Sequence, residues 1–209
     1  SLILPTHTIK QLTKSLGPEA APRRRAPGFV LSIPLLTPVS VRLLNVYRES
    51  ISDGPGLRYS IYLAGCRHAC PGCHNPDSWS AEAGIPLTEE VLSDMITEIR
   101  SNSLLDGITI SGGDPFYDPT ALAKLLARLR RETGLSIWCY TGFTVEYLLQ
   151  SEAHRPALEF IDVLVDGPFV QSLLDPRLYF RGSRNQRLVH IDHGVPLSAA
   201  ALSFLDDAF

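Results

Sequence analysis

Two hydrophobic periods alternate along the chain from Val41 onward. Short runs rich in β-branched and aromatic residues predict strands. These runs lie at residues 41–47, 59–63, 107–111, 136–140, 161–165 and 188–191. Between several of them, apolar residues recur every three or four positions, which predicts amphipathic helices. Strands that alternate with helices are typical of an α/β fold with a parallel sheet and crossover helices.

Capping residues mark the ends of the predicted helices. Thr88 is a candidate N-cap, because two glutamates follow it in the first turn, where the helix dipole favours negative charge. Asp118 caps a second helix, with Pro119 at its first position and Gly134 at its end. A shorter helix is expected after Thr144.

The number of predicted units limits the architecture. About six βα units fit into the chain after residue 40, whereas a closed barrel has eight in about 250 residues. We therefore expect an incomplete, open parallel β/α barrel, or an open sheet. In both, sites lie in the loops at the carboxyl ends of the strands. Residues 66–73, 111–115, 141–142 and 166–167 all follow predicted strands, so we expect the chemistry there.

Residues 1–40 differ from the rest of the chain. They contain five prolines between residues 18 and 38 and three consecutive arginines, and neither hydrophobic period persists. We expect a disordered extension, followed by one domain over residues 41–209. A mis-assigned start is an alternative, with initiation at Val41. A secretory signal fits less well, since prolines interrupt the apolar run.

Composition excludes several classes of protein. The chain has 209 residues, of which 44% are hydrophobic, and a net charge of −3, enough apolar material for one soluble domain. There is no basic excess to bind nucleic acid. The apolar stretch of residues 29–44 contains two prolines and Arg42, so we expect no membrane span. Four cysteines are too few for a disulfide scaffold.

Three of the cysteines have the spacing of metal ligands. Cys66, Cys70 and Cys73 offer three thiolates from one loop. They suit a [4Fe–4S] cluster with three irons held by protein and the fourth open. A structural zinc site with His68 or His74 as fourth ligand is an alternative, and a pair of redox cysteines is another. The absence of a second Cys/His pair at zinc spacing favours the cluster.

The same loop resembles a known family. Its C-x3-C-x2-C pattern is similar to the signature of the radical S-adenosylmethionine (SAM) superfamily. Residues 53–58 (DGPGLR) and 65–76 (GCRHACPGCHNP) resemble the glycyl-radical-enzyme activating branch, most of all the activases of anaerobic ribonucleoside-triphosphate reductases. Residues 111–116, 138–142, 162–169 and 181–187 resemble that family in the same order, so the likeness covers residues 41–191. Many radical SAM proteins have an aromatic residue where this chain has Gly72, but the Pro-Gly-Cys form resembles this branch. His74 stands where Tyr or Phe is common.

The resemblance implies a mechanism. SAM would bind the open iron of a [4Fe–4S] cluster, and one electron would cleave it to methionine and a 5′-deoxyadenosyl radical. That radical would take a hydrogen atom from a C-terminal glycine of the large anaerobic ribonucleotide reductase subunit. Since the four cysteines leave no room for a second cluster, the electron would come from an external donor such as flavodoxin or ferredoxin. A cytoplasmic location follows.

The resemblance also implies a SAM site. Gly112 and Gly113 lack Cβ atoms, so their backbone would approach the methionine moiety, and Asp114 or its neighbouring carbonyls would accept hydrogen bonds from its ammonium group. A turn in which Asp114 acts as a cap is the structural alternative. Further cofactor contacts are expected from Gly72, His74, Asn75, Thr141 and Asp166; capping is an equal alternative for Asp166.

A last group of candidates would line the site or bind the partner. They are Asp53, Gly54, Arg58, Arg181 and Asn185. The alternatives are an ordinary turn for residues 53–56 and a solvated loop for residues 181–187. Cys139 stands in the middle of a predicted strand and is expected to be a buried core thiol rather than a ligand.

Three other functions remain open. The chain could activate a different glycyl-radical enzyme. Additional cysteine-rich segments would favour that function, and the sequence has none. It could be a small-molecule enzyme similar to 7-carboxy-7-deazaguanine synthase, which would need a pocket closed within this chain. It could also be a zinc-binding interaction module, which would be colourless and inactive.

Overall fold

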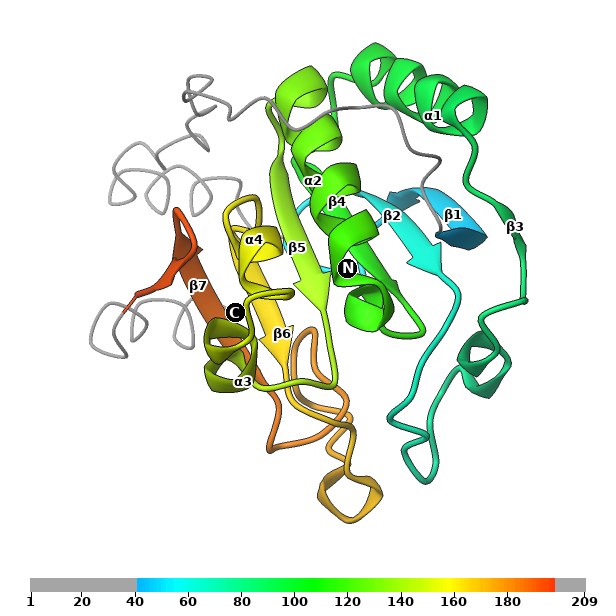
Figure 1. The fold of residues 1–209 in the computed structure, drawn as a ribbon. Coiled ribbons are helices and arrows are strands. Elements are labelled where there is room, and N and C mark those ends of the chain that lie inside the picture. The colour runs from blue at the N-terminus through cyan, green and yellow to red at the C-terminus, as the bar shows by residue number, and fades with distance from the viewer. Residues whose placement is uncertain (1–40, 198–209) are drawn as a thin grey trace, which may run out of the picture.

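The computed structural model describes residues 41–197, whose strands form one sheet (Figure 1). The strands are β1 (Arg42–Ser50), β2 (Arg58–Leu63), β3 (Ile85–Pro86), β4 (Gly107–Gly112), β5 (Ser136–Tyr140), β6 (Val163–Asp166), β7 (Arg187–Asp192) and β8 (Val195–Pro196). Their order across the sheet is β3-β1-β2-β4-β5-β6-β7-β8. The sheet is therefore open, with β3 and β8 at its edges.

The middle of the sheet is parallel and both sides are antiparallel. Strands β2, β4, β5 and β6 run parallel, whereas β1, β3, β7 and β8 run antiparallel to their neighbours. The α/β class is confirmed, but the prediction of about six parallel βα units is wrong. The connection of residues 51–57 is too short for a crossover, which needs about a dozen residues. The chain therefore turns back after β1.

The α-helices of residues 41–197 cover one face of the sheet (Figure 1). They are α1 (Glu89–Ser101), α2 (Pro119–Thr133), α3 (Val145–Gln150) and α4 (Arg155–Leu158). The predicted caps are confirmed: the side chains of Thr88, Asp118 and Thr144 accept hydrogen bonds from backbone N–H groups in the first turns of α1, α2 and α3. Gly134 ends α2 in the left-handed conformation, with φ +67°.

The two faces of the sheet bury different side chains. Residues such as Ile61, Ile110 and Cys139 point toward the helices and are fully buried in the main core, which also contains the leucines of α2. The opposite face carries a smaller apolar cluster around Trp138 and buried polar residues such as Thr109. Alternation along each strand therefore separates a packed face from a partly polar one.

Element boundaries are the least accurate predictions. Strand β5 matches its predicted range, and the other predicted strands differ by a few residues at their ends. The short strands β3 and β8 are not predicted, because two residues carry no hydrophobic period. Residues 1–40, for which an extension or a mis-assigned start is predicted, lie outside the described part. Within residues 41–197, no helix has the length and apolar character needed to cross a membrane.

Candidate functional site

The cysteine loop lies at the carboxyl end of the parallel strands, as expected. Residues 64–75 leave the end of β2 and extend below the sheet in Figure 1, beside the loop between β6 and β7. The two loops touch. A Cβ on Gly72 would lie 2.8 Å from the side chain of Gln171, and the rings of His74 and Phe169 have centroids 5.3 Å apart.

Backbone hydrogen bonds hold both ends of the cysteine loop. The N–H of Cys66 donates to the carbonyl of Trp79 over 3.1 Å, in the 3-10 helix η1 (Pro76–Trp79). Cys73 N–H donates to Cys70 O over 3.1 Å, which forms a tight turn between these two cysteines. Ala69 (φ +46°) and Gly72 (φ +74°) have left-handed conformations. These turns let three cysteines share one short loop.

The thiols are suited to an iron–sulfur cluster. All three are free and partly exposed. Burial raises the pKa of the Cys66 thiol, and the backbone N–H groups of His68 and Ala69 oppose that shift. Asn75 N–H lies 3.4 Å from Cys73 Sγ. Hydrogen bonds of this kind stabilise thiolate ligands, so the donor set fits the cluster.

An iron–sulfur cluster and a single metal ion require different arrangements of the three thiols. In residues 41–197, no three His, Cys, Asp or Glu side chains converge on a position for one metal ion. A cubane does not require such convergence, because each of its irons takes a separate thiolate. The two histidines expected to complete a zinc site have other contacts: His68 Nε2 lies 2.6 Å from Asp114, and His74 packs against Phe169.

Asp114 acts as a structural cap. Its side chain is 2% exposed. Oδ1 accepts from the N–H of Phe116 (2.9 Å) and the hydroxyl of Thr141 (3.0 Å), and Oδ2 accepts from Gly142 N–H (3.0 Å) as well as His68. These partners agree with the capping alternative, and a contact of Asp114 with the ammonium group of SAM stays a prediction.

The two glycines before Asp114 allow protein backbones to approach each other. A Cβ on Gly112 would lie 2.3 Å from the carbonyl oxygen of Leu63, and one on Gly113 would lie 2.5 Å from that of Gly65. Gly112 also has φ +112°. The predicted close approach is therefore made to the start of the cysteine loop. A contact of the same backbone with the methionine moiety stays a prediction.

Thr141 and Asp166 also have structural partners. The Thr141 hydroxyl donates to Asp114 and accepts from Phe143 N–H. Asp166 is fully buried, and its carboxylate accepts from the N–H of Val145 over 2.8 Å and from the guanidinium of Arg187. The capping interpretation is therefore correct for Asp166, and both side chains support the loops around the cysteines.

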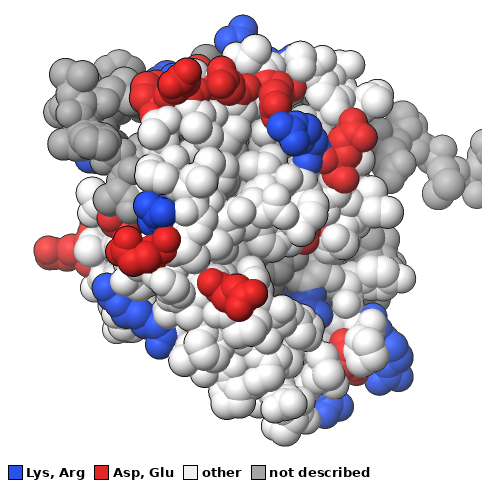
Figure 2. Space-filling model, turned by 90° about the vertical axis from the view of Figure 1, so that its right-hand side faces the viewer, with Lys and Arg blue, Asp and Glu red and all other residues white. Residues whose placement is uncertain are grey.

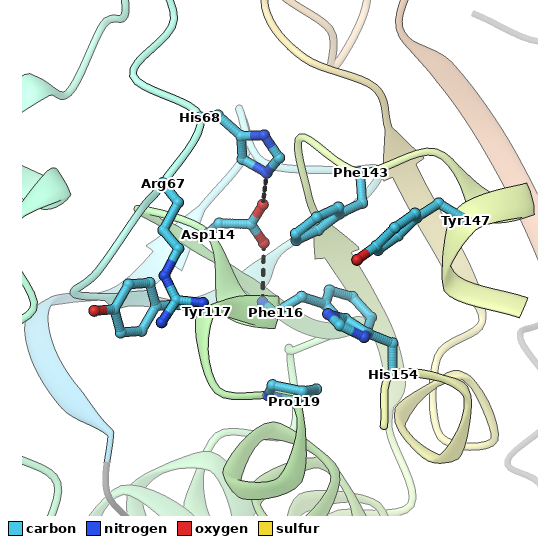
Figure 3. A pocket seen from close by; sticks show the side chains of 9 residues that line it. All are labelled: Arg67, His68, Asp114, Phe116, Tyr117, Pro119, Phe143, Tyr147 and His154. Carbon is cyan, nitrogen blue, oxygen red and sulfur yellow. Dashed lines mark hydrogen bonds and ion pairs between the residues drawn. The ribbon is translucent and has the colours of Figure 1, made fainter. Parts of the chain in front are cut away.

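A small recess lies beside the cysteine loop (Figure 3). Its volume is about 120 Å³. The Arg67 guanidinium lies over the ring of Tyr117, 4.4 Å from its centroid, and the Phe143 and Tyr147 rings stack on each other at 4.9 Å. Burial lowers the pKa of His154, which also lines the recess. Aromatic side chains thus form most of its wall.

Residues 53–58 lie at the amino ends of the parallel strands. Arg58 pairs with Gly107 at the start of β4 and is 1% exposed. Its guanidinium donates to the Thr109 hydroxyl (2.7 Å), and burial lowers its pKa to about 10. A partner cannot reach this side chain, so the prediction of a partner contact is wrong for Arg58. Gly54 packs beside it, since a Cβ there would lie 2.6 Å from Arg58 Cδ.

Asp53 has hydrogen-bond partners outside this segment. It accepts hydrogen bonds from the hydroxyls of Ser50 (2.6 Å) and Tyr62 (2.9 Å). These bonds connect the turn after β1 to β2. Asp53 also lines a hollow of about 410 Å³, together with Tyr47 and Glu49. This hollow is separate from the recess beside the cysteine loop.

The segment of residues 181–187 is attached to the end of β6. Arg181 and Asn185 are half-buried. Asn185 Nδ2 donates to the carbonyl of Pro168 over 2.7 Å, and the Ser183 hydroxyl accepts from Val170 N–H over 3.1 Å. The alternative of a solvated loop is therefore wrong. This segment closes the β6–β7 loop beside the cysteines.

The hydrogen bond between His68 and Asp114 is not among the sequence predictions. His68 is considered there only as a zinc ligand, whereas the structure joins it to Asp114. Both residues stand next to recognisable motifs, but they are 46 positions apart, and no local pattern reveals their contact. Cys139 is fully buried in β5, as predicted.

Comparisons with known proteins agree with this geometry. Residues 52–189 match the family model described as a 4Fe-4S single cluster domain. The anaerobic ribonucleoside-triphosphate reductase-activating protein of Escherichia coli K12 is 38% identical over 149 residues, 69% of this chain and 96% of that protein. The protein of the same name from Salmonella typhimurium is 38% identical over 72% of this chain and 99% of its own. The one from phage T4 is 33% identical, over 72% and 95% respectively.

These matches settle the family. They favour this family over the other functions left open by the sequence: a zinc-binding module, an activase for a different glycyl-radical enzyme, and an enzyme similar to 7-carboxy-7-deazaguanine synthase. The conserved unit spans both the cysteine loop and the strands that position it. The chain belongs to the family of anaerobic ribonucleoside-triphosphate reductase-activating proteins, radical SAM proteins with a single 4Fe–4S cluster domain.

Proposed function

We propose that this chain activates an anaerobic ribonucleoside-triphosphate reductase by generating a glycyl radical on its large subunit. One observation carries the proposal: three free, partly exposed thiols share a loop at the carboxyl end of the parallel strands. The match to reductase-activating proteins over nearly their whole length supports it. The sheet supplies the rigid frame, as in an incomplete β/α barrel.

The residues of this chain hold and shield the reacting groups. When bound, the reduced cluster and SAM supply the one-electron cleavage that gives methionine and a 5′-deoxyadenosyl radical. Cys66, Cys70 and Cys73 would hold three irons of the cluster. Gly72 and His74, both exposed at the rim of the loop, would lie near the bound SAM. Further contacts would come from Asn75 and from backbone groups of residues 112–113.

A protein substrate fits the shape of the site. The recess beside the cysteine loop has a volume of about 120 Å³, below the roughly 300–1,000 Å³ of typical ligand pockets. The face seen in Figure 2 has acidic side chains along its upper end, where α1 lies in Figure 1, and a largely uncharged middle. Protein interfaces are similarly poor in charge at their centres. The bound reductase would then exclude water from the radical.

The electron must come from outside the chain. Three of its four cysteines lie in the loop, and the fourth, Cys139, is fully buried in β5. The chain therefore has no thiols for a second cluster. An external one-electron donor such as a flavodoxin or ferredoxin would supply the electron, and we place the reaction in the cytoplasm with that donor.

Anaerobic reconstitution tests the proposed function. The protein would be loaded with iron and sulfide, reduced with dithionite, and mixed with SAM and the large reductase subunit. We expect formation of 5′-deoxyadenosine and the electron paramagnetic resonance (EPR) signal of a glycyl radical on the reductase. Cleavage of SAM without that radical would contradict the partner, and a protein that takes up no iron would contradict the cluster. Cys70→Ala serves as the inactive control.

A further inference from the structure

His68 stands midway between Cys66 and Cys70 in the sequence. Its Nε2 lies 2.6 Å from Oδ2 of Asp114, in the loop after β4. We propose that His68, held by Asp114, is a positioning residue that sets the conformation of the cysteine loop around the cluster. The inference rests on the 4Fe–4S cluster of the family and does not depend on which enzyme is activated.

Asp114 provides a rigid anchor for the imidazole. Its carboxylate is nearly inaccessible and is fixed by three groups besides His68: the N–H of Phe116, the N–H of Gly142 and the Thr141 hydroxyl. These donors come from the segments that follow β4 and β5. A buried carboxylate with several donors is costly to move, since each donor would lose its partner. The bond to His68 therefore ties the cysteine loop to two strands of the sheet.

Neighbouring residues also pack closely around the imidazole ring of His68. A Cβ on Gly142 would lie 2.5 Å from Cδ2 of His68, so only glycine leaves room for the ring at this position. The Phe143 ring packs edge-on against the imidazole, with centroids 4.6 Å apart and an interplanar angle of 73°. Figure 3 shows the ring directly above the Asp114 carboxylate, with Phe143 to one side of both. Packing fixes the ring plane, and the hydrogen bond fixes its direction.

Anchoring this side chain also constrains the backbone between the first two cysteines. Ala69, which lies between His68 and Cys70, has the left-handed φ of +46°. A non-glycine residue rarely adopts that conformation unless its surroundings hold it there. The His68 bond lies one residue away and supplies such a constraint. Contacts that orient the ligands of a metal site tune its stability and potential.

Two substitutions separate the hydrogen bond from the ring packing. His68→Phe keeps a ring against Phe143 but has no N–H for Asp114. His68→Gln loses the ring, but its amide can still donate to that carboxylate. The readouts are iron content after reconstitution, the rate at which a chelator removes iron, and the EPR spectrum of the reduced cluster, all without the reductase. Circular dichroism of each full-length variant checks the fold.

We expect the phenylalanine variant to lose iron to the chelator about tenfold faster than the wild type, the size typical of lost outer contacts to a metal site. Its EPR spectrum should also change. The glutamine variant should behave like the wild type, and so should Glu90→Gln, which alters an exposed side chain of α1. Two results would overturn the proposal: a phenylalanine variant with wild-type cluster properties, or a glutamine variant as defective as the phenylalanine variant.

Discussion

The guanidinium of Arg187, at the start of β7, bridges Asp166 and Glu146. Its Nε donates to Asp166 over 2.9 Å, and its terminal nitrogens donate to Glu146 over 2.8 and 3.0 Å. Asp166 is fully buried at the end of β6, whereas Glu146 lies in the first turn of α3. One side chain therefore joins three elements at the end of the sheet that carries the cysteines.

Removing that bridge should destabilise the fold. Arg187→Leu removes a charged hydrogen-bond donor from the fully buried Asp166 carboxylate, and leaving a buried acceptor short of a partner costs about 1–3 kcal/mol. Urea unfolding followed by circular dichroism measures the loss. The matched control is Arg177→Leu, which removes an ion pair whose arginine side chain is 86% exposed, and it should change the free energy of unfolding by less than about 1 kcal/mol. Equal losses in the two variants would contradict the assignment.

The same bridge should make stability depend on acid pH. Hydrogen bonding to Arg187 lowers the pKa of Glu146 to about 2, whereas an unfolded glutamate titrates near pH ~4.3. A carboxyl with a lowered folded pKa stabilises the fold above its unfolded pKa, and this stabilisation disappears as the pH falls toward 2. The free energy of unfolding of the wild type should therefore exceed that of Glu146→Gln at pH 6. The difference should shrink between about pH 5 and pH 2, and a constant difference would contradict the linkage.

Gly113 should be essential for the cysteine loop. A Cβ there would lie 2.5 Å from Gly65 O and 2.8 Å from Ser78 O, so Gly113→Ala should displace the start of the loop and lower the iron content after reconstitution. Gly134→Ala is the control, because a Cβ at that position meets nothing within 4 Å. Its positive φ should cost about 1 kcal/mol of stability, with no effect on iron content. Normal iron binding by Gly113→Ala would contradict the packing argument.

The four cysteines should separate into two classes. Replacing Cys66, Cys70 or Cys73 with alanine should abolish the brown colour of the reconstituted protein and the cleavage of SAM, since each would hold one iron. Cys139→Ala should keep both, because its thiol is fully buried in β5. Its expected effect is a modest loss of stability from the cavity left in the core. A folded Cys139→Ala protein without a cluster would overturn the ligand set.

Residues 41–209 should suffice for the chemistry. The family match begins at residue 52, and the described core begins with Val41, which is itself buried. A chain lacking residues 1–40 should therefore bind the same amount of iron and cleave SAM at the same rate as the full chain. Loss of folding on this deletion would show that the domain begins earlier. Iron content and 5′-deoxyadenosine formation measure the outcome.

Local patterns in the sequence determined the elements and the ligands. Thr88, Asp118 and Gly134 mark helix ends through their own hydrogen bonds and backbone angles, which involve only neighbouring residues. The spacing of Cys66, Cys70 and Cys73 places three thiols on one loop in almost any conformation. These interactions are short in sequence, so a linear pattern is enough to predict them.

The direction of the outer strands and the partners of the buried carboxylates were decided by tertiary structure. Asp114 and Asp166 are candidate SAM contacts in the sequence, yet both accept hydrogen bonds from residues distant along the chain, such as His68 and Arg187. A carboxylate takes the donors that folding brings within about 3 Å of it, and sequence spacing does not specify that distance. The sequence therefore determines which side chains stand at the carboxyl ends of the parallel strands. Tertiary packing determines which of these side chains remain free to contact a cofactor.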